Sequence, residues 1–470
     1  TAAYAASRKV AVVAPPRTVQ AAFAYTNFGQ PGNVAKKDAI DDLGATLVRF
    51  KNGVRLNLKP TDFEAGRIRV SVRIGGGTLT MPMDQPGLSL LANVAFTTGG
   101  LGKHSVDDLQ RLLAGRTVGL GFGAQTDAFT FGATTNRADL LLQLQLFCAY
   151  LTDPGYRPES LRQVHKAAEQ LYTRLAHTAD GPMSLEVDRL LAGGDARFGL
   201  PPKDVLLSRT LGELKAWLTP QFARGPIEIA IVGDFDPAAT IDAVAQTFGA
   251  LAERSDKPAY KDARKVTRPA EPIAKQYTVE SEIPKALVRL HWPATDARDV
   301  KLTRRLRLLC DVFADRLRVK IREEMGGTYS PNAAADLSDT YPGYGWIVAE
   351  ATVAPDQTRT IANAIKAVAT ALHDNGVTEE ELVRAKQPVL TALRESSRTN
   401  GYWLGSVLAA AQEFPERLDW SRTRYSDNEG VTTKELSALA KQYLDPARMS
   451  EFIVLPVPAK PEEPAPTRQP

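Results

Sequence analysis

Alternating apolar and polar positions mark the predicted β-strands of this chain. Residues 46–60, TLVRFKNGVRLNLKP, alternate on both sides of Asn52-Gly53. Because Asn and Gly tolerate the positive φ angles of a tight turn, this stretch predicts a hairpin. Further strands are predicted in RIRVSVRIGGG, in the glycine-spaced VGLGFGAQTDAFTFGATT, and in PIEIAIVGDF. The first half of the chain is therefore expected to contain a β-sheet.

Helices are predicted between these strands. Residues 85–97 form a mainly apolar segment. Ser105, followed by Asp108, has the pattern of a helix start, in which both side chains bind free backbone N–H groups. Longer helices are predicted at 138–151 and 158–177, and another after Asp236. The mixture of strands and helices predicts an α+β fold.

The second half of the chain repeats features of the first at a nearly constant offset. TLGEL at 210–214 and TTKEL at 432–436 share a threonine, a glutamate and a leucine, 222 residues apart. An Ile-Val pair at 231–232 recurs at 453–454 with the same offset. These matches predict two copies of one α+β domain. A chance match of a few positions is the alternative.

The repeat and the composition suggest domain boundaries. We predict a linker or extension at 1–39, a first domain at 40–250, a linker at 251–271, a second domain at 272–456 and a Pro-rich tail at 457–470. The linker LAERSDKPAYKDARKVTRPAE is charged and contains prolines. Both ends are rich in Ala or Pro and are expected to be linker or disordered chain, as in a fragment or a processed protein.

Composition and charge exclude little beyond this. Hydrophobic residues make up 43% and charged residues 24% of the chain, which is typical of a soluble globular protein. A net charge of +4 without a basic cluster gives no indication of nucleic-acid binding. No run of eighteen apolar residues predicts a membrane span. Cys148 and Cys310 lie in apolar stretches and are expected to be buried free thiols.

One short segment carries candidate chemistry. IREEMGGTYSP, residues 321–331, places Arg322 and Tyr329 on either side of a Gly-Gly turn. Taken alone, the segment indicates a helix end, with Arg322 paired to a neighbouring acid and Tyr329 packed in a strand. The alternative is that both side chains point at something outside this chain.

Together, the tandem domains, the VRFKNGVRLNLKP hairpin and REEMGGTYSP resemble the pitrilysin-type zinc peptidases, or inverzincins. Insulin-degrading enzyme and mitochondrial processing peptidase are relatives. The resemblance covers about residues 40–456. It implies two tandem homologous α/β-sandwich domains of the pitrilysin-like type. Active members carry H-x-x-E-H on a helix of the first domain, where two histidines bind zinc and the glutamate is the general base.

This sequence departs from that motif. The corresponding window, Leu90–Val94, reads LLANV and contains no histidine, acid or cysteine. Glu169 lies about where the family's downstream zinc-binding glutamate would fall, but a single carboxylate cannot hold a catalytic zinc. The five histidines form no short-spaced pair. We therefore predict no metal ligand and no cofactor in this chain, with zinc in a complementary half.

In the family, the half without zinc faces the zinc-bearing half across a closed chamber. It contributes an arginine and a tyrosine seven positions apart, the spacing of Arg322 and Tyr329. The resemblance implies that these two residues bind a peptide substrate and stabilise the oxyanion in trans. The chain would be the C-terminal half of a zinc metallopeptidase, inactive alone.

Other interpretations remain open at this point. A non-catalytic scaffold or peptide-binding subunit is one, and an unrelated α+β binding module is another. The expected partners are the zinc-bearing half and peptide substrates, without nucleic acid. A periplasmic location is expected because many long bacterial relatives are exported; the alternative is the cytoplasm.

Overall fold

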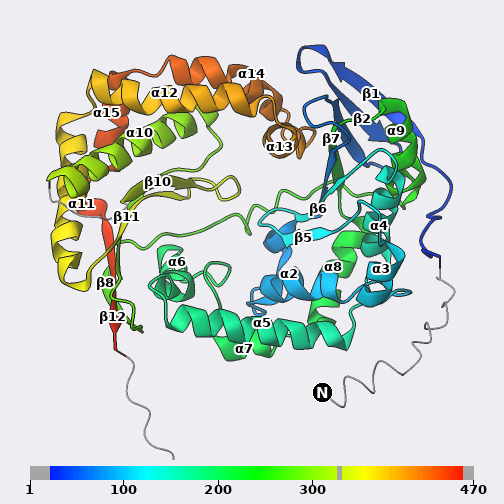
Figure 1. The fold of residues 1–470 in the computed structure, drawn as a ribbon, viewed down its shortest axis with the longest axis horizontal. Helices are drawn as coiled ribbons and strands as arrows, with labels where there is room; N and C mark the ends of the chain where they lie inside the picture. Colours follow the sequence, from blue (N-terminus) through cyan, green and yellow to red (C-terminus); the bar gives the residue numbers. More distant parts are fainter. Residues whose placement is uncertain (1–21, 325–330, 459–470) are drawn as a thin grey trace, which may run out of the picture.

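The computed structural model describes residues 22–324 and 331–458. It contains two β-sheets, each with its own set of helices (Figure 1). Among the described residues, no helix has both the length and the apolar character needed to cross a membrane. Cys148 and Cys310 are buried free thiols, as expected.

The first sheet has seven strands in the order β1-β2-β3-β7-β4-β6-β5. Neighbouring strands are antiparallel, except that β3 and β7 run parallel. The predicted hairpin around Asn52-Gly53 is confirmed as the β2–β3 connection. Along the sheet the strands are β1 (Val34–Ile40), β2 (Ala45–Phe50), β3 (Arg55–Pro60), β7 (Ile227–Gly233), β4 (Ile68–Ile74), β6 (Phe129–Thr135) and β5 (Gly121–Ala124).

The second sheet has five strands in the order β10-β11-β9-β12-β8. Read from the other edge, this order and all strand directions repeat the β3-β7-β4-β6-β5 part of the first sheet, including one parallel pair, β8 and β12. The predicted fold class is therefore confirmed, whereas the exact domain boundaries stay a prediction. The strands are β10 (Asn332–Leu337), β11 (Gly345–Val353), β9 (Ala286–Pro293), β12 (Ser450–Val457) and β8 (Ala274–Glu280).

Helices cover one face of each sheet, and Figure 1 shows α10, α11, α12, α14 and α15 gathered around the second sheet. The first unit has α2 (Leu88–Thr98), α3 (Val106–Leu112), α4 (Leu140–Thr152), α5 (Pro158–Ala176), α6 (Asp188–Leu191), α7 (Lys203–Leu207), α8 (Leu211–Arg224) and α9 (Pro237–Gln246). The second has α10 (Val300–Arg318), α11 (Thr358–Asn375), α12 (Glu379–Ser396), α13 (Asn400–Tyr402), α14 (Glu416–Glu429) and α15 (Thr433–Tyr443). Single turns of 3-10 helix occupy Asp41–Leu43, Gly77–Thr80, Phe248–Ala250, Pro355–Gln357 and Pro446–Arg448.

The repeated Thr-x-x-Glu motif begins equivalent helices in the two units. Thr210 and Glu213 form a capping box at the start of α8, and Thr432 and Glu435 form one at the start of α15. In each box the threonine side chain accepts the N–H of the glutamate, and the glutamate side chain accepts the N–H of the threonine. In both units the helix that begins with this motif precedes an equivalent strand, β7 in the first unit and β12 in the second.

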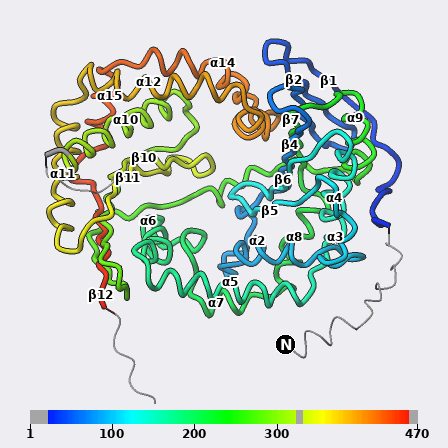
Figure 2. Tube along the Cα trace, in the orientation of Figure 1, coloured from blue at the N-terminus to red at the C-terminus, as the bar shows by residue number. Residues whose placement is uncertain are grey.

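Each unit also places a turn of π-helix on the uncovered face of the other unit's sheet. In the first unit, η3 (Met183–Val187) packs with α6 against apolar side chains of β9, β11 and β12. In the second unit, η7 (Trp403–Leu408) packs against β7 and the β1–β2 region. Figures 1 and 2 show α13, which leads into η7, beside β7. Each unit thus buries the uncovered sheet face of the other unit.

Candidate functional site

The Arg322 end of the predicted site lies at the end of a helix. A π-helical turn, η5 (Val319–Glu324), continues α10. Ile321 is fully buried in the core of the second unit, whereas Arg322 is exposed. Tyr329 lies outside the described residues. The structure therefore places Arg322, whereas its position relative to Tyr329 stays a prediction.

The window that corresponds to the zinc motif lies on α2. Leu91 and Ala92 are fully buried in the core of the first unit. Asn93 is exposed, and its Oδ1 accepts a hydrogen bond from the backbone N–H of Ala124 in β5, at 2.8 Å. These side chains do not fit zinc, because they offer only one amide oxygen where the metal needs three protein ligands.

Glu169 lies on α5, which packs beside α2. Its carboxylate is exposed and forms an ion pair with Lys203 at the start of α7. Over residues 22–324 and 331–458, no three His, Cys, Asp or Glu side chains are grouped so that they could hold a metal ion. Glu169 thus lies on a helix next to α2, and its partner in this chain is a lysine.

The histidines occupy separate structural sites. His104 accepts the backbone N–H of Ala24 at its Nε2, at 3.0 Å, and stacks on Phe23. His291 is buried on β9 with its ring edge-on to Trp346 and Phe452. Burial lowers the pKa of His291 to about 3, and the charge of Arg289 adds to the effect. His291 is therefore neutral at physiological pH.

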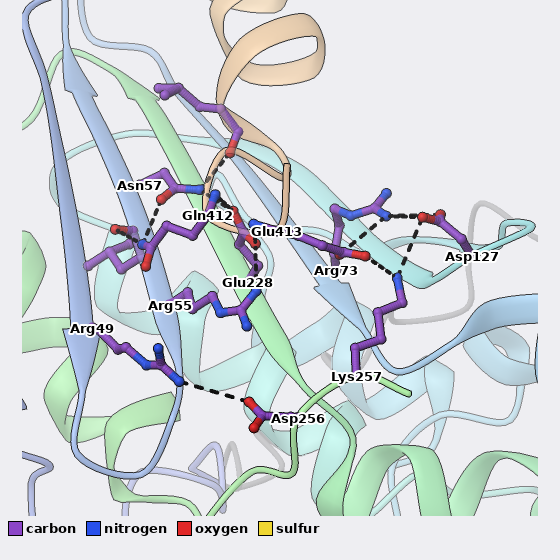
Figure 3. Close-up of polar contacts among 12 residues, drawn as sticks. Arg49, Arg55, Asn57, Arg73, Asp127, Glu228, Asp256, Lys257, Gln412 and Glu413 are labelled. Atoms are coloured by element: carbon purple, nitrogen blue, oxygen red, sulfur yellow. Dashed lines mark hydrogen bonds and ion pairs between the residues drawn. The ribbon is translucent and has the colours of Figure 1, made fainter. Parts of the chain in front are cut away.

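The junction between the units contains a buried carboxylate that the sequence analysis missed. Glu228 of β7 is only 3% exposed. Its Oε1 accepts hydrogen bonds from Nδ2 of Asn57 at 2.6 Å and from the backbone N–H of Gln412 at 2.7 Å (Figure 3). Its Oε2 accepts the backbone N–H of Glu413 at 3.0 Å and lies 3.6 Å from Nη1 of Arg55. The first sheet thereby holds the backbone that follows η7.

The side chain of Gln412 extends this contact into the first sheet. Its Nε2 donates to Oδ1 of Asn57 at 2.8 Å and to the carbonyl of Val48 at 3.1 Å.

Burial raises the pKa of Glu228, and the donors around its carboxylate oppose that effect. A charged residue in the otherwise apolar stretch IEIAIV was the available signal, although the sequence does not show what it would bind.

A second charge cluster lies beside the first. Nη2 of Arg73 donates to both carboxylate oxygens of Asp127, each at 2.9 Å (Figure 3). Nζ of Lys257 donates to Oε1 of Glu413 at 2.6 Å and lies 3.5 Å from Oδ2 of Asp127. Burial opposes ionisation of Asp127, but Arg73 and Lys257 outweigh it and lower the pKa of Asp127. The cluster ties the inter-unit linker and the second unit to the first sheet.

Comparisons with known proteins agree with this architecture. Residues 210–389 match a family model described as the peptidase M16 inactive domain. The chloroplastic stromal processing peptidase of Pisum sativum is 22% identical over 438 residues, which cover 82% of this chain and 34% of the relative. The probable zinc protease PqqL of Escherichia coli (strain K12) is 23% identical over 481 residues, covering 96% and 48%. The chain thus spans less than half the length of these relatives.

Solved structures show the same fold. The periplasmic protease PqqL from Escherichia coli superposes with a TM-score of 0.77 at 19% identity, covering 97% of this chain and 50% of that chain. The peptidase M16 inactive domain from Pseudomonas fluorescens has a TM-score of 0.72 at 20% identity, covering 91% of this chain and 100% of that chain. Residues 210–389 therefore match the inactive domain of the M16, or pitrilysin-type, peptidases, and the chain has the fold of these peptidases.

Proposed function

We propose that this chain is the half of an M16 zinc peptidase that binds no metal, and that it works with a zinc-bearing half in hydrolysing peptides within a closed chamber. The observation that carries the proposal is the retained M16 fold, with an inactive-domain match, around an α2 window that has no zinc ligand. The zinc of the reaction is assigned to the complementary half.

Arg322 and Tyr329 are the residues proposed to act on the substrate. Arg322 is exposed in η5, which precedes the edge strand β10 along the chain. A guanidinium offers five N–H donors in a fixed plane, which suits substrate carbonyls. A tyrosine hydroxyl can donate to the oxyanion that forms when the peptide carbonyl is attacked, and one such donor is worth roughly 3–4 kcal/mol.

The test is peptide turnover by this chain combined with its zinc-bearing half. Arg322→Ala and Tyr329→Phe are each expected to lower kcat by about 10²–10³-fold, as loss of one preorganised donor does. Arg398→Ala is the matched control, because Arg398 is an exposed arginine outside the proposed site. Unchanged turnover in both variants would contradict the proposal and favour a scaffold. Activity of the isolated chain that survives a chelator would also contradict it.

The location of the protein is a further part of the proposal. The related PqqL is described as periplasmic, and the related stromal processing peptidases are chloroplastic. We propose the periplasm, with the cytoplasm as the alternative. Fractionation of the native cells, followed by an immunoblot for this chain, decides between them.

A further inference from the structure

A hollow lies where the two units and the linker between them meet. It consists of two adjoining pockets of about 730 and 580 Å³, which share Val300, Thr303, Arg307, Arg417 and Trp420. Helices α10 and α14 form its walls, the linker contributes Lys261, and Arg73 and Asp127 of the first unit close one end. We call these two pockets together the junction hollow.

The junction hollow is strongly basic. Among its described lining residues, eight are arginine or lysine and four are aspartate or glutamate. This excess of four positive charges equals the net charge of the whole 470-residue chain, +4. The small net charge therefore hides a concentrated positive region, which attracts anionic ligands.

Several of these cations have partners within the protein. Arg73 is bound by Asp127, and Arg304 forms an ion pair with Asp427. Arg264 donates to the backbone carbonyl of Thr340 at 2.9 Å. These contacts fix the walls of the junction hollow, and Asp427, which is not a lining residue, offsets one of the positive charges counted above.

Two arginines shared by both pockets are not neutralised. Within the described part of the chain, neither Arg307 nor Arg417 forms an ion pair. Arg307 is exposed on α10. Arg417 is half-buried on α14. Among the described residues, its guanidinium has one hydrogen bond, a long contact of 3.4 Å to the carbonyl of Gly405, and it lies over the ring of Phe414, 5.7 Å from the ring centroid. Burial and the charge of Arg73 lower the pKa of Arg417. A half-buried guanidinium without a carboxylate is costly, and an anionic ligand would remove that cost.

The remaining lining favours a peptide over a small anion. Trp420 and Phe414 add aromatic surface. Ala333, Ala334 and Ala335 of β10 line the pocket, and β10 is an edge strand that pairs with β11 alone in the described sheet. An edge strand offers backbone N–H and C=O groups to an extended chain, and small side chains let that chain approach.

We propose that the junction hollow binds an acidic segment of an extended peptide, with carboxylates on Arg307 and Arg417 and the peptide backbone along β10. Arginine–carboxylate pairs can be bidentate, so they are stronger and more directional than neutral hydrogen bonds. That this peptide is a substrate rests on the proposed peptidase function. The binding itself does not, because it requires this chain alone.

The experiment measures peptide binding to the full chain by fluorescence anisotropy. The probe is a fluorescein-labelled ten-residue peptide with four glutamates in a Gly/Ser background, and the reference peptide has glutamine at those positions. We expect the glutamate peptide to bind at least about tenfold more tightly in low salt, and the preference to shrink as salt rises. Equal affinity for the two peptides would overturn the proposal.

Variants then locate the site. Arg307→Ala is expected to weaken binding of the glutamate peptide by about tenfold, and Arg307 is exposed, so its loss leaves the fold intact. Arg417→Ala should weaken it at least as much, and circular dichroism checks that this half-buried position still folds. Arg398→Ala is the control and should bind as the unchanged chain does. An unchanged affinity in Arg307→Ala would overturn the assignment.

Two further results separate this inference from others. Binding of pyrophosphate without binding of the glutamate peptide would overturn the peptide assignment in favour of a small anion. Turnover by the reconstituted peptidase tests the proposed peptidase function independently. If Arg322→Ala loses activity but the unchanged chain shows no preference for the glutamate peptide, the proposed peptidase function stands and the proposed acidic-peptide site is rejected.

Discussion

The uncovered faces of the two sheets differ at the same place in the fold. In the first sheet, Arg73 of β4 stands opposite Glu228 of β7. In the second sheet, the equivalent strands β9 and β12 place His291 opposite Ser450. At equivalent positions, one sheet thus places an arginine opposite a glutamate and the other places a neutral histidine opposite a serine. The two units therefore share the place in the fold where the junctions form, but they differ in the side chains that form them.

Each junction therefore holds its partner segment in its own way. The Glu228 carboxylate binds backbone N–H groups of the second unit, which specifies the position of residues 412–413. The second sheet instead buries apolar and aromatic side chains such as Phe452 against Met183 of η3. Apolar packing is non-directional, whereas a buried acceptor has to meet its donors.

The largest effect is expected from removing the buried carboxylate. Glu228→Ala leaves two backbone N–H groups and one N–H of the Asn57 amide without an acceptor, while the Asn57 amide keeps its bond to the carbonyl of Leu408. The free energy of unfolding should therefore fall by about 3–5 kcal/mol. Urea denaturation measures the change. Glu228→Gln is the control, because it keeps the shape and one acceptor oxygen, and it should cost less. A loss below about 1 kcal/mol in Glu228→Ala would show that the hydrogen-bonded junction is not needed for stability.

The second prediction concerns pH and the neutral counterpart, His291. Its pKa in the folded chain, about 3, lies below the ordinary value of 6.5, so its neutral form contributes stability above pH 6.5. That contribution is lost as the pH falls from 6.5 towards 3, on the order of 3 kcal/mol by pH 4. His291→Phe cannot take up this proton, so its unfolding free energy should fall less between pH 7 and pH 4.

The comparison of the two proteins isolates this residue, because all other titrating groups are common to both. Arg289 on the same strand and its ion-pair partner Glu350 are present in both proteins. Equal pH dependence in the two proteins would mean that the buried imidazole is protonated without cost, against the burial that the structure shows.

The features that the sequence predicted are those whose signal is local. The Asn52-Gly53 hairpin and the Thr-x-x-Glu helix starts are encoded within a few residues, and the repeat offset extends them to the whole topology. The acceptor role of Glu228 depends on donors 184 and 185 residues away, so no local pattern reveals it. No local pattern predicts the junction hollow either, because its arginine and lysine residues come from separate segments of the chain. Arg322 is placed at a helix end, as its sequence context indicated, and its role with Tyr329 stays a prediction.

The smallest effect tests whether the two units are equivalent where their sequences agree. Thr210→Ala and Thr432→Ala each remove a helix cap, and each should lower the free energy of unfolding by about 1 kcal/mol. The paired glutamates have similar surroundings, since Glu213 is bound by Arg209 and Glu435 by Arg305. Serine at either position keeps the hydroxyl acceptor and should restore most of the loss. Because the two caps lie in different units, the double variant should lose the sum of the single losses within about 0.5 kcal/mol. A double variant that loses much more would show that the junctions couple the two units, so that weakening one helix start makes the other matter more.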